Sequence, residues 1–515
     1  MGDFLTGYAQ TQPDKPAVID DRGHGEVRSF TFRELNEAAN RLAHVFLDKG
    51  AGEGRTVVWC GQNSIGIVTA INACRKIGVT AVPLNYRLSA DEAAYVTDHS
   101  DAVIAYVDAE FASLFAEIRD RIPKVEHVLV FDGAALPGQD SCDELVAAAS
   151  TDEPPAGVPG AVMIYTSGTT GKPKGALRRG TGDPTQTQRM IAFYGYRPDD
   201  VYLTTGPLYH SGPGGFMGIG QLLGQTVVVQ RKFNPEDWLR LLDTYRCTST
   251  FSAPTPIRMI CNLPQEVKDR YDRSSMRVMI ANAAPWPFAL KQQYVANFPP
   301  ESLWEVYGST EMGVNCILQP ADQMRKPGSC GRPAPGVEIR LYDEQGNVVD
   351  GIGPDYTGEL FVRSASMFAD YYKQHDKYLE DQRDGWQTVG DIAYRDEEGF
   401  YYICDRKKDM IISGGMNVYP AEIEAALEAH RDIVEAAVFG IPSEEWGESV
   451  HAVVVPRPGS GLDEAAVAAH AKANLANYKV PRSVSFLDEL PKTGSGKVLK
   501  RELRNPFWAG HDRRV

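Results

Sequence analysis

Residues 161–175 of this 515-residue chain read AVMIYTSGTTGKPKG. The apolar run AVMIY predicts a buried strand. The loop that follows combines glycines, Ser and Thr hydroxyls, Lys172 and Lys174. Backbone N–H groups, hydroxyls and positive charge without bulky side chains are what a phosphate-holding loop requires. The loop is not a Walker A motif, because GKP stands where GK[ST] is needed. A glycine-rich surface turn is the alternative interpretation.

Short apolar runs alternate with helical patterns on both sides of this loop. Residues 33–50 and 67–78 have apolar residues at helical spacing and end at a glycine. Further buried strands are predicted at residues 56–61, 80–85, 103–107, 127–131, 226–230 and 277–281. Strand–helix alternation is typical of parallel sheets with crossover helices, so we expect an α/β fold.

The pattern changes twice toward the C-terminus. Residues 336–405 contain alternating strands separated by Gly and Asp turns, which predicts an antiparallel sheet or a small barrel. From residue 406 a compact helix and strand pattern follows, about 110 residues long, which is enough for a separate α+β domain. We therefore predict a large N-terminal domain, 1–405, and a small C-terminal domain, 406–515.

Composition narrows the classes of function. Lys and Arg number 53 against 68 Asp and Glu, so the net charge is −15, and nucleic acid is not an expected partner. No apolar run approaches the roughly 18 residues of a membrane span. The eight cysteines contain no C-x-x-C pair, which argues against a disulfide framework or a local zinc site and favours a cytoplasmic protein with reduced thiols. A homodimer is left open.

The C-terminal segment 491–503 reads PKTGSGKVLKREL. Its GSGK does not complete a Walker A loop, because Pro491 occupies the first glycine position and Val498 follows Lys497. Residues 491–515 hold seven Lys or Arg and two Asp or Glu. A basic segment on an acidic protein suggests a local contact with a polyanion, although a solvated basic tail is the alternative.

Several motifs occur in a fixed order: YTSGTTGKPKG at 165–175, YGSTE at 307–311, GWQTVGD at 385–391, DRKKDMIISGGMNVYPAEIE at 405–424 and PKTGSGKVLKREL at 491–503. Together they resemble the adenylate-forming superfamily of acyl-CoA synthetases, firefly-type luciferases and peptide-synthetase adenylation domains. The chain looks most like a fatty-acid or related carboxylate CoA ligase. The resemblance implies an acyl-AMP made from an acid and Mg-ATP, transfer of the acyl group to CoA, and a mobile C-terminal domain that rotates between the two half-reactions.

The resemblance also implies roles for matching residues. It assigns ATP or AMP contacts to Thr166, Ser167, Gly168, Thr169, Thr170, Gly171, Lys172, Lys174, Ala283, Ala284, Pro285, Tyr307, Gly308, Ser309, Thr310, Asp391, Arg406 and Lys497. Within this set, Asp391 would bind the ribose, Thr310 the α-phosphate, and Lys497 both the acid carboxylate and ATP. Glu311 would hold Mg²⁺.

The remaining roles concern the hinge, CoA and the acid. Lys408 would be the hinge residue, and Gly414 and Gly415 would line the path of CoA. His210, with Lys497, Thr310 and Glu311, completes the expected catalytic set. The expected acid pocket contains His210, Gly212, Phe216, Met217 and Trp286. For Trp286, core packing is an equal alternative.

The expected acid is a medium- or long-chain fatty acid. Residues 201–235 contain no Asp or Glu, so no carboxylate is available there for the ammonium of an amino acid. A bulky steroid side-chain or aryl carboxylate, or a carrier protein in place of CoA, is the alternative. A non-catalytic binder is disfavoured, because the key residues are all present. Four positions depart from the family pattern: Asn282, Val389, Asp405 and Met416.

Overall fold

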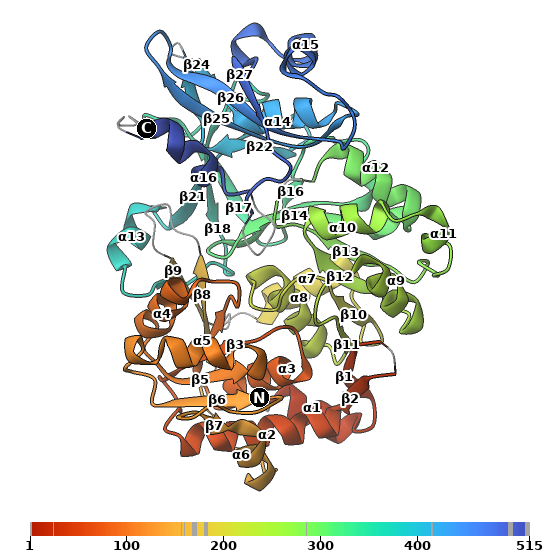
Figure 1. Cartoon of the computed structure of the whole chain (residues 1–515), viewed down its shortest axis with the longest axis vertical. Helices are drawn as coiled ribbons and strands as arrows, with labels where there is room; N and C mark the ends of the chain where they lie inside the picture. The colour runs from red at the N-terminus through yellow and green to blue at the C-terminus, as the bar shows by residue number, and fades with distance from the viewer. Residues whose placement is uncertain are drawn as a thin grey trace.

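The computed structural model describes residues 3–23, 25–155, 157–158, 160–166, 173–179, 184–284, 286–413, 416–492 and 498–509. Figure 1 shows a large lower body, which runs from the red N-terminus to the cyan segments, and a smaller blue body above it. The predicted fold class is confirmed: two mixed sheets and a curled antiparallel sheet form the large body, and a small α+β unit follows. The division at residue 405/406 stays a prediction.

An eight-stranded sheet carries the phosphate-loop strand. Its order is β19-β9-β8-β4-β3-β5-β6-β7. Its strands are β3 (Thr56–Cys60), β4 (Thr80–Leu84), β5 (Ala102–Asp108), β6 (His127–Phe131), β7 (Asp140–Ser141), β8 (Ala161–Thr166), β9 (Lys174–Arg179) and β19 (Asp370–Tyr371). The strands from β8 to β7 pair in parallel, whereas β9 pairs with β8 in antiparallel fashion.

Five helices belong to the segment that forms this sheet: α2 (Phe32–Asp48), α3 (Ile65–Lys76), α4 (Ala90–His99), α5 (Ala112–Glu117) and α6 (Cys142–Ala148). Helix α2 begins with a capping box, in which Thr31 and Glu34 each satisfy a backbone N–H of the first turn. One face of α2 is buried, as its apolar spacing predicts.

The nine-stranded sheet includes the N-terminal strand, which the sequence pattern did not predict. Its order is β16-β15-β14-β13-β12-β10-β11-β1-β2. The strands are β1 (Pro16–Asp21), β2 (Val27–Thr31), β10 (Val201–Thr204), β11 (Thr226–Val229), β12 (Ser249–Ser252), β13 (Val278–Ala281), β14 (Leu303–Ser309), β15 (Gly313–Leu318) and β16 (Arg332–Pro333). The helices are α1 (Phe4–Thr11), α7 (Pro184–Tyr194), α8 (Ser211–Leu222), α9 (Pro235–Thr244), α10 (Pro254–Cys261), α11 (Gln265–Lys268) and α12 (Phe288–Asn297).

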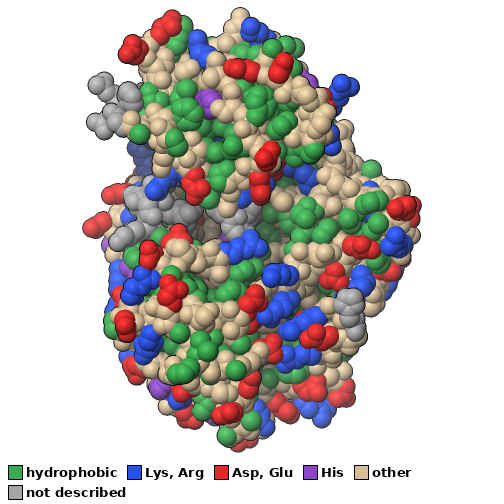
Figure 2. All heavy atoms as spheres, viewed as in Figure 1, with side chains coloured by type: hydrophobic (Ala, Val, Ile, Leu, Met, Phe, Trp, Pro, Cys, Tyr) green, Lys and Arg blue, Asp and Glu red, His purple; other side chains and the backbone are tan. Residues whose placement is uncertain are grey.

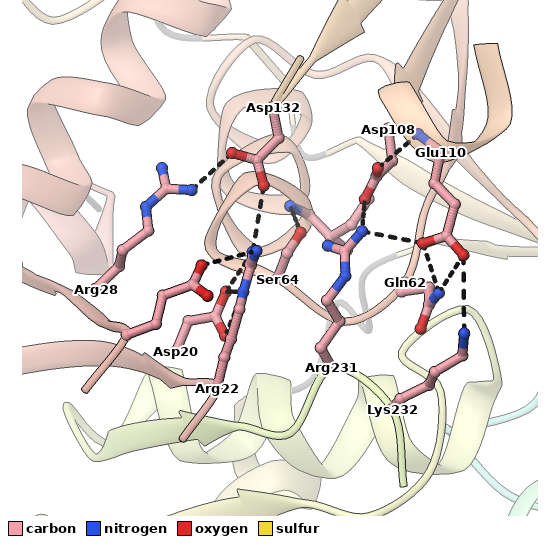
Figure 3. Close-up of polar contacts among 12 residues, drawn as sticks. Asp20, Arg22, Arg28, Gln62, Ser64, Asp108, Glu110, Asp132, Arg231 and Lys232 are labelled. Carbon is pink, nitrogen blue, oxygen red and sulfur yellow. Dashed lines mark hydrogen bonds and ion pairs between the residues drawn. The ribbon is translucent and has the colours of Figure 1, made fainter. Parts of the chain in front are cut away.

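Ion pairs fasten the two large sheets together where their strands end (Figure 3). Asp132, after β6, lies 2.6 Å from Arg28 and 3.2 Å from Arg22 of the first hairpin. Asp108, at the end of β5, lies 2.9 Å from Arg231, which follows β11. Asp108 is only 2% exposed, so burial raises the pKa of its carboxyl while Arg231 opposes that shift. Figure 2 shows Lys and Arg side chains gathered on this face of the large body.

The antiparallel sheet is formed by β17 (Glu338–Tyr342), β18 (Gly358–Arg363), β20 (Gln382–Arg383), β21 (Trp386–Arg395) and β22 (Tyr401–Arg406), with α13 (His375–Glu380) beside it. The small unit contains β23 (Ile411–Ser413), β24 (Met416–Val418), β25 (Ile433–Ser443), β26 (Gly447–Pro456), β27 (Ser483–Phe486), α14 (Pro420–Glu428), α15 (Glu464–Asn474) and α16 (Lys500–Arg504). Its own apolar core includes Ile411, Ile423 and Val450.

All eight cysteines are free thiols, and seven of them are buried. Within the described ranges, no helix has both the length and the apolar character needed to cross a bilayer.

One buried carboxyl in the small unit gives a pH-dependent prediction. Burial raises the pKa of Glu428 on α14 from 4.5 to about 7, and Glu424 and Glu435 add to the shift. Because the folded-state pKa is the higher one, stability falls as the pH rises through about 7. We therefore expect Glu428→Gln to raise the Tm relative to wild type at pH 8, with a smaller gain at pH 5, in thermal scans at each pH. The matched control is Glu445→Gln at an exposed position of the same unit. An equal Tm gain at both pH values would contradict the assignment.

Candidate active site

The carboxylate of Glu311 lies at the end of β8, the strand that leads into the predicted phosphate loop. Its Oε1 accepts hydrogen bonds from the Thr166 hydroxyl at 3.0 Å and from the Tyr371 hydroxyl at 3.2 Å. Thr166 is the last residue of β8, and Tyr371 lies in β19. Glu311 is 8% exposed. A buried carboxylate is therefore held where the loop 167–172 begins, although that loop itself lies outside the described residues.

The turn between β14 and β15 brings Glu311 to this position. A side chain on Gly308 would place its Cβ 2.0 Å from the carbonyl oxygen of Gly313, so only glycine fits. The Met312 N–H donates to the Ser309 hydroxyl at 3.0 Å. These contacts fix the conformation that the YGSTE motif adopts.

Arg178, to which no sequence motif pointed, supports the same turn. Its guanidinium donates to the carbonyl oxygens of Thr310 at 2.5 Å and of Ser366 at 2.7 Å. Burial lowers the pKa of Arg178, and the charge of Glu311 opposes that shift. The sequence feature that could have pointed to Arg178 is a charged residue in the strand that follows the predicted phosphate loop.

Thr310 also meets the segment that carries His210. The hydroxyls of Thr310 and Ser211 lie 3.0 Å apart. His210 is the N-cap residue of α8, and its ring lies 4.5 Å from that of Tyr209. Two of the expected catalytic residues, Thr310 and His210, are therefore close together in space, although they are far apart in the sequence.

Asn63, to which no sequence motif pointed, holds the loop that precedes His210. Its amide donates to the carbonyl oxygen of Gly206 at 3.0 Å, and its Oδ1 accepts the N–H of Leu208 at 2.9 Å. Asn63 is buried. A side chain that follows β3 therefore fixes the backbone of a loop that follows β10.

Asp391 contacts Tyr307 and Arg406, two other residues that were predicted to bind ATP. Its Oδ2 accepts the Tyr307 hydroxyl at 2.5 Å, and its Oδ1 lies 3.3 Å from Nε of Arg406. Asp391 and Arg406 are partners across β21 and β22. Burial raises the pKa of Tyr307 well above its usual value, and the charge of Asp391 adds to that shift. This carboxylate is thus oriented by groups from two different sheets.

The segment expected beside adenine adopts a left-handed turn. Ala283 has a φ of 74°, a region that L-residues rarely occupy. Asn282 stabilises this turn, because its amide donates to the carbonyl oxygen of Val306 and its Oδ1 accepts the N–H of Ala283. The Asn282 departure noted in the sequence therefore has a structural role. Ala284 is half-buried in the same turn.

Two further expected residues are cations: Lys174 is buried and Lys408 is half-buried. Lys174 is 5% exposed and lies 5.4 Å from the ring centre of Tyr371. Burial lowers its pKa, and the nearby Lys377 contributes to the shift. The pKa of Lys408, which follows β22, is also lowered by burial and by the charge of Arg406.

The residues expected to contact the acid fall into two groups. Phe216 stacks on Phe251 at 5.5 Å, and Met217 is fully buried in the same apolar cluster. A Cβ on Gly212 would lie 2.3 Å from the Phe251 ring, so the ring fills the space that the glycine leaves. Trp286 instead belongs to a separate cluster behind the nine-stranded sheet, where its ring lies 6.5 Å from that of Tyr294.

Aromatic side chains continue the cluster around Phe216. The Tyr194 ring lies 6.0 Å from Phe216 and 5.2 Å from Trp304. The Phe193 ring lies 5.8 Å from Trp304. Aromatic rings from α7, β12 and β14 therefore lie beside Phe216, in the segment expected to bind the acid.

Several expected site residues fall outside the described residues: Ser167, Gly168, Thr169, Thr170, Gly171, Lys172, Pro285, Gly414, Gly415 and Lys497. Their roles stay predictions.

A metal would have to use few protein ligands. In the part of the chain that the structure describes, no three His, Cys, Asp or Glu side chains gather as a metal site. Mg²⁺ is commonly bound by one or two carboxylates together with substrate phosphates. A single buried carboxylate, Glu311, beside a phosphate loop fits this mode of binding.

The chain matches known protein families over most of its length. Residues 5–372 match the family described as AMP-binding enzyme, and residues 422–497 match the AMP-binding enzyme C-terminal domain. The chain is similar to the indoleacetate–CoA ligase of Aromatoleum aromaticum, with 33% identity over 98% of this chain and 97% of that protein. It is also similar to the fatty acid–[acyl-carrier-protein] ligase ScoC of Streptomyces coeruleorubidus, with 31% identity over 99% and 96%.

A solved structure extends the similarity to the fold. The crystal structure of ATP-bound MatB from Rhodopseudomonas palustris has a TM-score of 0.85 and 29% identity, and the match covers 99% of this chain and 100% of that one. The chain therefore belongs to the family of AMP-binding enzymes and is an AMP-forming acid–thiol ligase.

Proposed function

We propose that this enzyme is a CoA ligase that activates an aromatic carboxylic acid through an acyl-adenylate. The observation that carries this proposal is the contact of Glu311 with the end of β8. The oriented carboxylate of Asp391 and the aromatic cluster around Phe216 support it. In this proposal Glu311 lies on the side of the site that binds phosphate and metal, Asp391 on the side that binds ribose, and the aromatic cluster on the side that binds the acid.

The chemistry explains why these residue types are needed. In the first step, a carboxylate oxygen of the acid attacks the α-phosphorus of ATP, and the bond to pyrophosphate breaks. Because both reactants are anions, their repulsion must be offset by cations and hydrogen-bond donors. In the second step, the CoA sulfur loses its proton and attacks the acyl carbon, and AMP leaves.

Each residue has a proposed part in the first step. Asp391 accepts the ribose hydroxyls, since a carboxylate can accept two hydrogen bonds at once. Thr310 donates to the α-phosphate, and Lys497 neutralises charge between the acid and the nucleotide. Glu311 would hold Mg²⁺, which supplies positive charge against the phosphates when it is bound.

The second step is proposed to need a different arrangement of the small unit. Gly414 and Gly415 would then line the path of the CoA thiol, and rotation would occur near Lys408, at the predicted boundary 405/406. Val389 and Met416, which depart from the family pattern, have no assigned effect on either step.

The aromatic cluster favours an aryl acid over the fatty acid that the sequence suggested. Phe193, Tyr194, Phe216, Phe251 and Trp304 pack ring against ring. We propose that the acid binds at the edge of this cluster, where a flat ring would pair favourably with the aromatic side chains. One similar protein is named for indoleacetate. Another is named for a fatty acid and an acyl carrier protein, so a fatty acid and that acceptor form the rival proposal.

Lys497→Ala tests the adenylation chemistry. Without the ammonium group, acid-dependent ATP–pyrophosphate exchange should fall by about 10²–10³, the usual cost of losing one charge-stabilising donor. Transfer from a supplied acyl-adenylate to CoA should stay close to the wild-type rate. Both half-reactions are measured on the same preparations. Equal loss in both would contradict the proposed role.

Glu311→Gln tests the metal site. Glutamine can still accept hydrogen bonds from Thr166 and Tyr371, but it lacks the charge that attracts Mg²⁺. We expect the Mg²⁺ concentration for half-maximal exchange to rise roughly tenfold or more. Glu301→Gln, an exposed position just before β14, is the matched control. An unchanged Mg²⁺ dependence would refute the assignment.

A panel of acids tests the substrate class. Straight-chain acids from about C4 to C24, steroid acids and aryl acids including indoleacetate are assayed by pyrophosphate release and CoA consumption. We expect the best aryl acid to exceed every straight-chain acid by about tenfold or more in kcat/KM. A medium- or long-chain optimum would favour the rival proposal instead. Adenylate that accumulates in the presence of free CoA would indicate a carrier-protein acceptor.

A further inference from the structure

The loop that carries Lys497 has a closed base. Lys492 and Val498 form an antiparallel bridge across it. The N–H of Leu499 donates to the carbonyl oxygen of Pro491 at 2.8 Å. Residues 493–497 lie outside the described residues, but the two ends of the loop are fixed beside each other. Whatever orients Lys492 therefore orients the point from which the Lys497 loop starts.

Glu435 binds that base. This residue lies in β25 of the small unit, and its two carboxylate oxygens accept hydrogen bonds from Nζ of Lys492 at 2.8 and 2.7 Å. The side chains of Glu435 and Lys492 are 15% and 18% exposed. The pair is thus largely removed from solvent, where charge–charge interactions are stronger than at an open surface.

The same carboxylate also contacts the large body of the protein. Nη1 of Arg258 donates to Oε1 of Glu435 at 3.1 Å and lies 3.4 Å from the carbonyl oxygen of Val434. Arg258 lies in α10, directly after β12, the strand that contributes Phe251 to the aromatic cluster. Arg258, Glu435 and Lys492, which we call the loop triad, therefore connect the acid-binding side of the large body to the base of the Lys497 loop.

The other flank of the loop is held mainly within the small unit. Lys500 lies 2.7 Å from Glu424, whose Oε1 accepts the N–H of Val438 at 2.6 Å. Asp405, the departure at the end of β22, accepts the N–H of Ala421 at 3.0 Å and attracts Lys500. The Lys500 flank would largely keep its partners if the small unit turned.

We propose that Arg258 and Glu435 are positioning residues for adenylation, which hold Lys492, at the base of the loop that carries Lys497, against the large body in the ATP-dependent step. This inference rests on the proposed role of Lys497. Because α10 and β25 belong to different bodies, a rotation of the small unit would separate Arg258 from Glu435 while Glu435 kept Lys492. The triad therefore stabilises one orientation of the small unit and contributes nothing to thioester formation.

The two residues should differ in how much their loss costs. Loss of Arg258 leaves Glu435 paired with Lys492, so the loop base survives and only the link between the two bodies is broken. Loss of the Glu435 charge leaves two cations close together with no carboxylate between them, which is unfavourable for the loop base as well. We therefore expect Glu435→Gln to be the more severe change.

Arg258→Met tests the inference. We expect acid-dependent ATP–pyrophosphate exchange to fall about tenfold, as expected for one partly buried ion pair, with an unchanged KM for ATP. Transfer from a supplied acyl-adenylate to CoA should be unchanged. Arg258→Lys, which keeps the charge, should restore most of the exchange rate. The Arg258→Met, Glu435→Gln double variant should be no worse than Glu435→Gln alone. The assays use the acid with the highest turnover in the panel above.

A readout that needs no acid accompanies the assays. In the presence of Mg-ATP, hydrogen exchange in the peptide covering 488–500 should be faster in Arg258→Met than in wild type, because the loop base has lost its contact with the large body. The matched control is Arg240→Met, which removes an arginine that pairs with Asp21 and Asp237 within the large body. This control should change stability but not the ratio of the two half-reactions.

The outcomes separate the two proposals. Equal loss of both half-reactions in Arg258→Met, failure of Arg258→Lys to restore exchange, or no change in either measurement would overturn the positioning role. If Lys497→Ala itself retains full exchange, the proposed function of Lys497 fails first. If Lys497→Ala abolishes exchange and Arg258→Met does not alter it, only the present inference fails.

Discussion

The hydrogen bond from the Thr166 hydroxyl to the Glu311 carboxylate is the contact on which the site depends. It joins the last residue of a strand in the eight-stranded sheet to the turn after β14 in the nine-stranded sheet. A buried carboxylate needs partners, and Thr166 and Tyr371 supply them from one sheet while Glu311 comes from the other. Thr166, which precedes the predicted phosphate loop, and the carboxylate that we propose holds Mg²⁺ can therefore meet only when both sheets are packed together.

A shared apolar cluster packs the two sheets together, and ion pairs add specific contacts between them. The chain is acidic overall, with a net charge of −15. Arginines and lysines nevertheless lie beside carboxylates at the contact between the two large sheets and in the small unit. Arg231 lies beside Asp108 at the contact between the two large sheets, and Arg258 lies beside Glu435 at the contact between the large body and the small unit. Partly buried pairs of this kind contribute more to specific geometry than to net stability, because desolvation offsets much of their attraction. They suit an enzyme whose parts must meet in a defined arrangement.

Much of the fold could be predicted from local pattern. The predicted strands and helices of the large body and the small unit form as expected, because apolar periodicity is a local property of the chain. The N-terminal strand β1 was missed, since its place beside β11 depends on a partner more than 200 residues away. The antiparallel pairing of β9 with β8 could likewise not be derived from strand–helix alternation.

The motifs of the candidate site could be predicted from the sequence, whereas the side chains that hold those motifs in place could not. The sequence by itself determined the residue types of the predicted phosphate loop, because glycines, hydroxyls and lysines suit a phosphate. The YGSTE turn and Asp391 were predicted from the resemblance to the adenylate-forming superfamily. Only the tertiary structure decided that Arg178 and Asn63 hold the turn and loop beside them, that Trp286 lies in a separate cluster, and that Glu435 reaches Arg258. The reason is physical: a side chain can be assigned to a long-range hydrogen bond or ion pair only when its partner's position in space is known.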